Sequence, residues 1–240
     1  MRLFHALIEK NNDFASRNPV TLVALGDSVT HGCFETFRTH DGGLECRYDY
    51  ESVYHARLRK KCATILPAAP LNVINAGISG DSAPGGLARL QRDVLHFAPD
   101  LVTVCFGLND VNGGMEKIEQ YTTALTGIFQ ALHDHHIDTI FITPNMMNSY
   151  VSPALTDPGL AEFAAHTAAL QQTGVMDAYM EAARTVCTQM DVPLCDVYRQ
   201  WRHLADAGVD TTALLANHIN HPTREMHALF ADALFAMLAF

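Results

Sequence analysis

Five short apolar runs, spaced along the chain, most constrain the fold that this sequence can adopt. Each run has the length of a β-strand, is rich in branched residues, and is apolar at consecutive rather than alternate positions. That pattern is typical of parallel strands whose two faces are both covered by helices. The runs are residues 21–25, 71–75, 101–106, 139–143 and 192–195.

Segments with helical spacing separate these runs. In the last of them, which starts near Thr223 and reaches the end of the chain, apolar residues recur at i, i+3, i+4 and i+7. Strands that alternate with helices predict a doubly wound parallel sheet with right-handed crossovers. The other helical segments are predicted at residues 50–63, 85–96, 118–135 and 175–190, with a helical extension at residues 1–20.

Two segments show neither the pattern of a strand nor that of a helix, and they are predicted to be loops at the active site. Residues 33–49 hold mixed charges and Gly42-Gly43, and residues 144–159 are rich in Asn, Ser and Pro. Both come soon after a predicted strand, so we expect them to overhang the carboxyl edge of the sheet. Ligands of open α/β folds bind along that edge.

Length and charge limit the classes of function open to this chain. Its 240 residues fit a single α/β domain over 1–240, and no linker or repeat divides it. The net charge of -10 argues against nucleic acid as the main partner, because phosphate binding needs a basic surface. No apolar stretch is long enough to span a bilayer.

The cysteines and the N-terminus together predict a cytoplasmic location. The six cysteines are scattered and form no CxxC pair, which indicates reduced thiols. Charged residues soon interrupt the apolar patch at the N-terminus, so the core of a signal peptide is missing. Neither observation defines an oligomeric state.

Three of the predicted strands end in residues suited to acyl transfer. The first ends in Gly26-Asp27-Ser28, which places a serine hydroxyl at the sheet edge, beside the free N–H groups of a helix start. The second ends at Gly77, where a backbone N–H can approach a ligand closely. The third leads into Asn109, whose amide can donate to an oxyanion. Taken singly, each residue fits an ordinary cap or turn equally well.

His221 completes this set of residues. It stands before Pro222 in the loop that precedes the final helix, from which it can reach across the sheet edge to Ser28. With 13 histidines in the chain, a single histidine is weak evidence for an active site. The stronger evidence is the joint occurrence of Ser, Gly, Asn and His, in that order, along one predicted edge.

These four blocks resemble those of the SGNH, or GDSL-type, hydrolase family. The matching residues are Gly26-Asp27-Ser28, Gly77, Gly107-Leu108-Asn109-Asp110 and His221-Pro222, and the resemblance runs from about residue 21 to residue 240. It implies a flavodoxin-like α/β/α sandwich of three layers with a parallel five-stranded sheet, and hydrolysis of esters or thioesters. It also implies that Ser28 is the nucleophile, that His221 is the general base, and that Ser28, Gly77 and Asn109 form the oxyanion hole.

One position departs from the family's pattern. The family usually has an Asp three residues before the catalytic His, and this chain has His218 there, which cannot replace an anionic partner of His221. A backbone carbonyl could orient the imidazole of a Ser–His dyad, Asp210 or Asp196 could reach it, or the protein could be weakened or inactive. The intact Ser, Gly, Asn and His favour the dyad.

The sequence therefore predicts a carboxylic ester hydrolase for short-chain or acetyl esters of small molecules, with acetylated carbohydrates among the candidate substrates. The alternative is a non-catalytic or weakly active ligand-binding protein with the same fold. His218, His221 and His227 match no zinc-binding spacing, so neither a metal nor another cofactor is expected.

Overall fold

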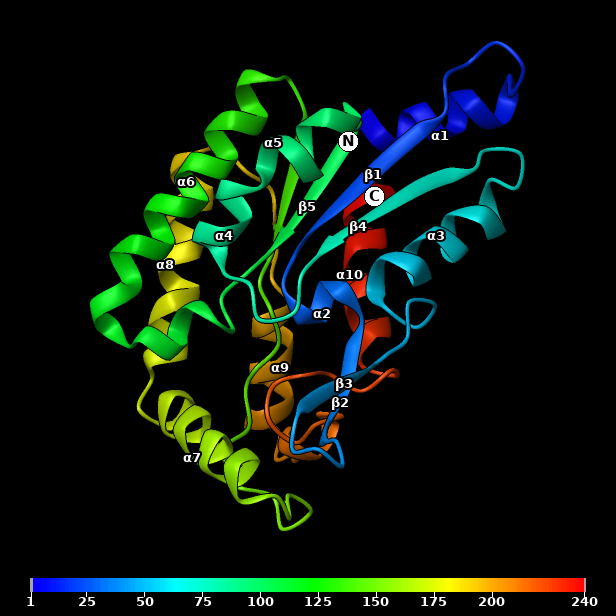
Figure 1. The fold of residues 1–240 in the computed structure, drawn as a ribbon. Coiled ribbons are helices and arrows are strands. Elements are labelled where there is room, and N and C mark those ends of the chain that lie inside the picture. Colours follow the sequence, from blue (N-terminus) through cyan, green and yellow to red (C-terminus); the bar gives the residue numbers. More distant parts are fainter. Residues whose placement is uncertain (1, 240) are drawn as a thin grey trace.

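A parallel sheet of five strands, in the order β4-β1-β5-β6-β7, lies at the centre of the computed structural model, which describes residues 2–239 (Figure 1). Every residue of β5 is buried, because helices cover both faces of the sheet. The order and the parallel pairing confirm the predicted fold class. The strands are β1 (Val20–Gly26), β4 (Leu71–Gly77), β5 (Leu101–Cys105), β6 (Asp138–Ile142) and β7 (Leu194–Cys195).

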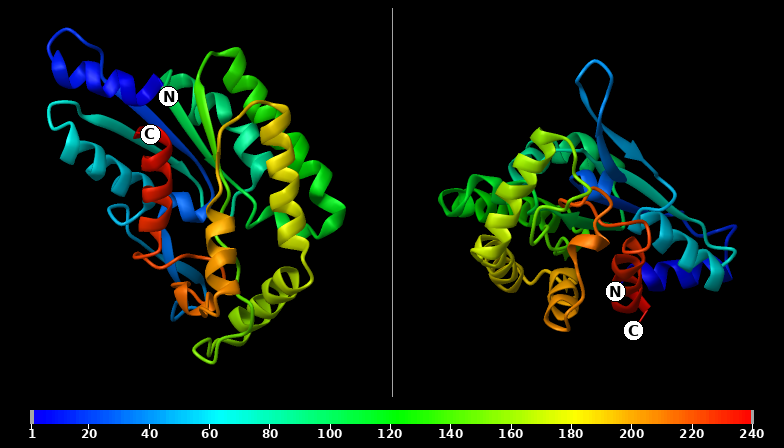
Figure 2. Two further views of the ribbon diagram at one scale, coloured as in Figure 1. Left: turned by 180° about the vertical axis from the view of Figure 1, so that it is seen from behind. Right: turned by 90° about the horizontal axis from the view of Figure 1, so that it is seen from below.

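Helices form the two outer layers (Figures 1 and 2). On one side α3 packs against α10, with α1 beside α10, and on the other side α4, α6 and α8 pack in a row. None of the described helices is long and apolar enough to cross a membrane. The predicted last residue of the final helix, 240, lies outside the described residues. The helices are α1 (Arg2–Asn12), α2 (Ser28–His31), α3 (Tyr54–Ile65), α4 (Ala83–Ala88), α5 (Leu90–Asp93), α6 (Ile118–Asp134), α7 (Pro158–Gln172), α8 (Val175–Gln189), α9 (Val197–Asp206) and α10 (His227–Ala239), with 3₁₀ turns η1 (Leu95–Phe97), η2 (Asp110–Gly113), η3 (Met115–Lys117) and η4 (Thr212–Leu214).

Helices α7 and α9 were not predicted from periodicity, although both begin with recognisable signals. The Asp157 side chain accepts the N–H of Leu160 and Pro158 follows it, which is a favourable N-cap and first residue for α7. The Asp196 side chain caps α9 in the same way. The single helix predicted at residues 85–96 is instead divided into α4, α5 and η1.

The segment 33–49 is a β-hairpin and not the irregular loop that its composition predicted. Its strands, β2 (Cys33–Arg38) and β3 (Leu44–Tyr48), pair antiparallel. A disulfide joins Cys33 to Cys46 across the hairpin, so the prediction of six reduced thiols is wrong for these two residues. Disulfides rarely persist in a reducing cytoplasm. The cysteine pattern therefore no longer supports a cytoplasmic location.

Candidate active site

Ser28 is the first residue of α2 and follows directly on the tight turn after β1. Asp27 caps the short helix, because its Oδ1 accepts the N–H of Val29 at 3.0 Å. Gly26 is required by close packing, since a Cβ atom there would lie 2.7 Å from the carbonyl oxygen of Cys105. The Ser28 residue is only 4% exposed. We call residues 26–32 the nucleophile turn.

The imidazole of His221 meets the Ser28 hydroxyl. Its Nε2 lies 2.9 Å from Ser28 Oγ, although 193 residues separate the two along the chain. His221 belongs to a loop that we call the histidine loop (residues 217–224). The Asn217 side chain holds this loop, because its Oδ1 accepts the N–H groups of Ile219, Asn220 and His221 at 2.9–3.0 Å.

The segment after β6, residues 144–157, supports the histidine loop from outside. Asn145 Nδ2 donates to the carbonyl of Asn220 at 2.9 Å, and the N–H of Asn148 donates to the carbonyl of Ile219 at 2.8 Å. Both asparagine side chains are buried, so these bonds are shielded from competing water. The segment predicted as a loop at the active site thus holds the backbone that carries His221.

A backbone carbonyl orients the imidazole of His221. The Nδ1 atom lies 2.9 Å from the carbonyl oxygen of Phe34, at the start of the hairpin. A carbonyl oxygen can only accept, so Nδ1 carries the proton and the Nε2 lone pair faces the Ser28 hydroxyl. This is the tautomer that a general base needs.

None of the side chains considered as orienting groups makes a hydrogen bond to this imidazole. His218 has a left-handed backbone (φ 56°), and its buried Nδ1 has no partner among the described residues. Asp210 accepts a hydrogen bond from the Tyr150 hydroxyl at 2.7 Å. Asp196 is bound to Arg184 and to the start of α9.

Burial sets the protonation state of His221. Desolvation lowers its pKa from 6.5 to about 4, and the Phe34 carbonyl opposes that shift only in part. The imidazole is therefore neutral at pH 7. A neutral imidazole with a free Nε2 lone pair can accept the proton of the Ser28 hydroxyl.

Gly77 has a structural reason to be glycine. A Cβ atom there would lie 2.2 Å from the backbone nitrogen of His31, so the missing side chain lets α2 pack against β4. Its N–H is already donated to Asn75 Oδ1 at 3.0 Å. Gly77 is thus not a free N–H donor in this structure, contrary to the role that the resemblance implied.

Gly80 presents the kind of N–H group that was expected at Gly77. The N–H of Asp81 donates to the carbonyl of Ile78, so residues 78–81 form a β-turn with Gly80 (φ 81°) at its third position. No acceptor for the Gly80 N–H occurs within residues 2–239. Asn109 Nδ2 donates to the carbonyl of Asp81 at 2.8 Å, which places the Asn109 side chain beside this turn.

Two buried carboxyl groups support these turns. Burial raises the pKa of Asp27 to about 7 and the pKa of Asp110 to about 6. Each uses one oxygen to accept a backbone N–H, that of Val29 for Asp27 and that of Ala83 for Asp110. These contacts fit structural support of the turns, and neither carboxyl group makes a hydrogen bond to His221.

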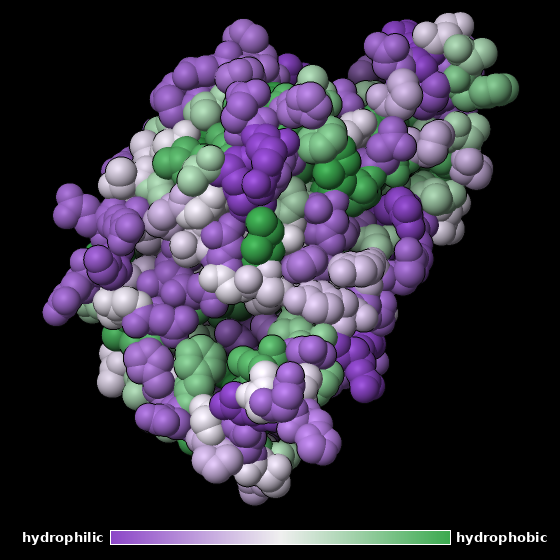
Figure 3. Space-filling model, in the orientation of Figure 1, coloured by the Kyte–Doolittle hydropathy of each residue, from purple (hydrophilic) through white to green (hydrophobic). Residues whose placement is uncertain are grey.

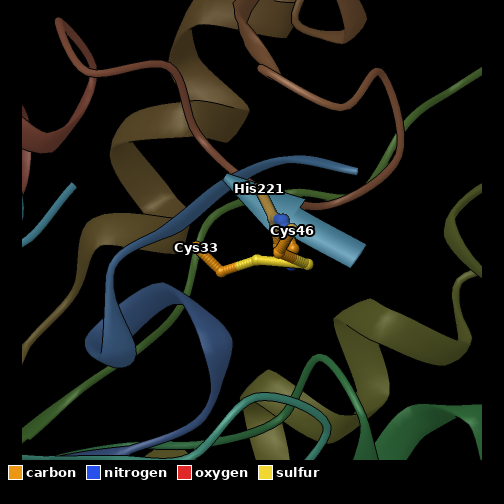
Figure 4. Close-up of side chains that lie close together, drawn as sticks. All are labelled: Cys33, Cys46 and His221. Atoms are coloured by element: carbon orange, nitrogen blue, oxygen red, sulfur yellow. A yellow bond between two sulfur atoms is a disulfide. The ribbon is translucent and has the colours of Figure 1, made fainter. Parts of the chain in front are cut away.

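One group of metal-ligand side chains occurs in the described part of the chain, formed by Cys33, Cys46 and His221 (Figure 4). One ligand atom from each lies within 4.8 Å of the others. The two sulfur atoms are joined in the disulfide and offer no thiolate, and both imidazole nitrogens already have partners. The arrangement therefore does not fit a metal centre.

Comparison with known proteins identifies the family. The model of the GDSL-like lipase/acylhydrolase family matches residues 24–229. The chain belongs to this family and is a carboxylic ester hydrolase.

Two curated proteins are similar in sequence. The uncharacterized lipoprotein YqeF of Bacillus subtilis (strain 168) is 24% identical over 199 residues, which are 78% of this chain and 72% of YqeF. An arylesterase of Vibrio mimicus is 32% identical over 102 residues, which are 40% of each protein. The similarity to the arylesterase thus spans less than half of either chain.

Solved structures share the fold along almost the whole chain. Axe2, an acetylxylan esterase from Geobacillus stearothermophilus, has a TM-score of 0.67 at 21% identity, covering 92% of this chain and 94% of Axe2. LAE5, an alpha/beta hydrolase enzyme from the metagenome of Lake Arreo, Spain, has a TM-score of 0.66 at 25% identity, covering 91% and 94%. At 21% identity, the likeness to Axe2 is a likeness of fold.

Proposed function

We propose that the protein hydrolyses short acyl esters through an acyl-enzyme formed on Ser28, with His221 as general base and general acid. The observation that carries this proposal is the 2.9 Å contact between Ser28 Oγ and His221 Nε2, with Nδ1 of the same ring held on a carbonyl. A hydroxyl, a correctly protonated imidazole and an orienting acceptor are the parts that serine catalysis requires.

The reaction steps follow from the protonation of the imidazole, in which Nε2 has a free lone pair and Nδ1 carries a proton. Ser28 Oγ attacks the ester carbonyl carbon while His221 Nε2 takes the hydroxyl proton. The tetrahedral intermediate then expels the alcohol, which leaves with the proton from Nε2. Water, deprotonated by Nε2, attacks the acyl-serine, and the returning proton restores the Ser28 hydroxyl as the carboxylic acid leaves. The Phe34 carbonyl stabilises the imidazolium at Nδ1 throughout.

Three N–H donors can stabilise the oxyanion in this scheme. They are the backbone N–H of Ser28, the second amide hydrogen of Asn109, and the backbone N–H of Gly80 in place of Gly77. Neither backbone N–H has an acceptor among the described residues, and Asn109 uses one amide hydrogen to hold the carbonyl of Asp81. Loss of one such donor typically lowers kcat about 10²–10³-fold. Asn109→Ala is therefore expected to lower kcat by that factor.

Acetylated carbohydrates are the proposed substrate class. The shared fold with an acetylxylan esterase supports this choice. Apolar residues on the face drawn in Figure 3 are interspersed with polar ones, which suits a polar substrate better than a long acyl chain. Rates on p-nitrophenyl acetate and p-nitrophenyl octanoate, and acetate release from acetylated xylo-oligosaccharides, would test this choice. Faster hydrolysis of the octanoate ester would contradict it.

The proposed nucleophile can be tested with p-nitrophenyl acetate. Ser28→Ala is expected to reduce kcat/KM by about 10⁴-fold or more, because the attacking oxygen is lost. Ser16→Ala, at an exposed position before β1, is the matched control and should keep the native rate. Equal rates for the native protein and Ser28→Ala would remove the proposal.

A further inference from the structure

We propose that Arg224 is a positioning residue for the catalytic pair: it fastens the β2–β3 hairpin to the histidine loop and so keeps the Phe34 carbonyl on the imidazole of His221. The inference rests on the proposed function, since it assigns Arg224 a task in the same site. It explains how the chain manages without the acid that the family usually carries at position 218.

The Arg224 side chain contacts the hairpin at three points. Its Nη1 and Nη2 donate to the two carboxylate oxygens of Glu35 at 2.6 and 3.2 Å. Its Nε donates to Asp49 Oδ2 at 3.0 Å. Its Cζ lies 4.3 Å from the centre of the Phe34 ring. One guanidinium therefore contacts Phe34 and Glu35, which are neighbours in β2, and Asp49, which directly follows β3.

Arg224 connects the two segments that form the hydrogen bond at His221 Nδ1. It lies three residues after His221, and Glu35 directly follows Phe34. The two partners of the Nδ1–H hydrogen bond are 187 residues apart in sequence. Arg224 joins their two segments beside that bond, whereas the Cys33–Cys46 disulfide joins the hairpin only to itself.

The chemistry of the contact favours a fixed geometry. A planar guanidinium that binds both oxygens of a carboxylate restricts the rotation of the two groups relative to each other, whereas an ion pair with one contact leaves them free to rotate. The Arg224 side chain is 29% exposed, so water competes only in part for its hydrogen bonds. The hydrogen bond from Arg224 is the largest cause of the lowered pKa of Glu35, so this carboxylate stays ionised at neutral pH.

A carbonyl that orients His221 depends on the contacts of Arg224 more than an aspartate at position 218 would. An Asp at position 218 would share the loop of His221, and the two would move together. The Phe34 carbonyl belongs to a hairpin of two strands, which is a marginally stable unit on its own. A shift of about 1 Å in a catalytic contact can cost about 10²-fold in rate.

The first arm of the test is kinetic. Arg224→Gln removes the charge and the bidentate contact, and Arg224→Lys keeps the charge alone. With active sites counted by fluorophosphonate labelling, kcat per labelled site should fall about 10–100-fold in Arg224→Gln, with KM within about twofold of native and Arg224→Lys between the two. The control is Arg184→Gln, which removes a comparable half-buried arginine bound to Glu181 and Asp196. It should keep the native kcat per site.

The second arm reads the imidazole directly. NMR of protein labelled with ¹⁵N-histidine, with the signal assigned by its absence in His221→Ala, reports the Nδ1 proton and its exchange with water. We expect a protected Nδ1 proton in the native protein and in Arg184→Gln, and rapid exchange in Arg224→Gln. A merely stabilising arginine would lower the melting temperature without this change.

Two outcomes decide the inference. It is overturned if Arg224→Gln keeps both the protected proton and a kcat per site within about twofold of native. If Arg224→Gln does not fold, Glu35→Gln takes its place, with faster exchange expected and unchanged exchange counting against the inference. If the native protein hydrolyses no ester and Ser28 takes no label, the proposed function fails separately, and the exchange of the Nδ1 proton still decides the role of Arg224.

Discussion

The nucleophile turn and the histidine loop meet at one edge of the sheet, and they differ in how the reacting side chain is oriented. Both backbones have local and distant supports: Asp27 caps α2 and the Asn217 side chain holds the histidine loop, while Arg89 donates to the carbonyl of Gly26 and the segment after β6 donates to the histidine loop. The Ser28 side chain is placed by the capped helix start to which it belongs. The imidazole of His221 is instead oriented by the Phe34 carbonyl, which is 187 residues away in sequence.

This difference indicates where the site is vulnerable. Substitutions near Ser28 act on the reacting atom or its cap. Substitutions far away in sequence, in the hairpin or after β6, act on the base. The predictions below separate the two halves and run from the largest expected effect to the smallest.

His221→Ala tests whether the histidine loop is as necessary as the nucleophile turn. We expect kcat/KM for p-nitrophenyl acetate to fall about 10⁴-fold or more, because among residues 2–239 only the His221 side chain is hydrogen-bonded to the Ser28 hydroxyl. His133→Ala, which alters an exposed helix end, serves as the control. Activity within about tenfold of native in His221→Ala would mean that another group acts as the base.

The acid limb of the pH profile tests the burial of the base. Because desolvation lowers the pKa of His221 to about 4, the neutral form persists well below pH 6.5. We expect kcat/KM to stay level from neutral pH down to about pH 5 and to fall through about pH 4. An acid limb near pH 6.5 would show that the imidazole is solvated and that the histidine loop is less closed than described.

Asp27→Asn tests the electrostatics of the nucleophile turn. Burial raises the folded-state pKa of Asp27 from 3.8 to about 7, so the folded protein keeps a proton that the unfolded chain loses. The stability due to this group is therefore present below about pH 4 and is lost as pH rises to about 7. Asn can still accept the N–H of Val29 and cannot ionise. We therefore expect the free energy of unfolding of the variant, relative to that of the native protein, to be about 1–3 kcal/mol higher at pH 8 than at pH 5. Urea unfolding of both proteins at both pH values measures this change, and the same difference between the two proteins at pH 5 and pH 8 would contradict it.

His218→Asp has the smallest expected effect. It restores the family's usual acid, and Asp tolerates the left-handed backbone at this position. Because the Phe34 carbonyl already accepts the hydrogen bond from Nδ1–H, we expect kcat/KM to change by less than about threefold. A gain of about 100-fold would show that the carbonyl is a poor substitute for the acid.

The sequence is sufficient to predict the sheet, since the central strand β5 is buried throughout and apolar runs mark the other strands, including β4 at the sheet edge, where Asn72 and Asn75 are exposed. It also places Ser28 and His221 at the same edge, where the structure brings them into contact. Their side chains carry the chemistry, so residue type and order reveal them.

The orienting and supporting groups leave no comparable trace in the sequence. The acceptor at Phe34 is a backbone carbonyl, which every residue possesses, and Arg224 gains its role only from the fold. Gly77 is the last residue of β4 and Gly80 comes three residues later, and the β-turn and the occupied N–H of Gly77 distinguish them. The hairpin was missed because the strands of segment 33–49 are largely exposed and polar, which hides their period.

Covalent labelling by a fluorophosphonate, followed by mass mapping of the peptides, tests the serine–histidine pair most directly. The account predicts a single adduct at Ser28 in the native protein, and a labelling rate that falls to background in His221→Ala. An adduct at another residue, or an undiminished rate without the imidazole, would contradict it.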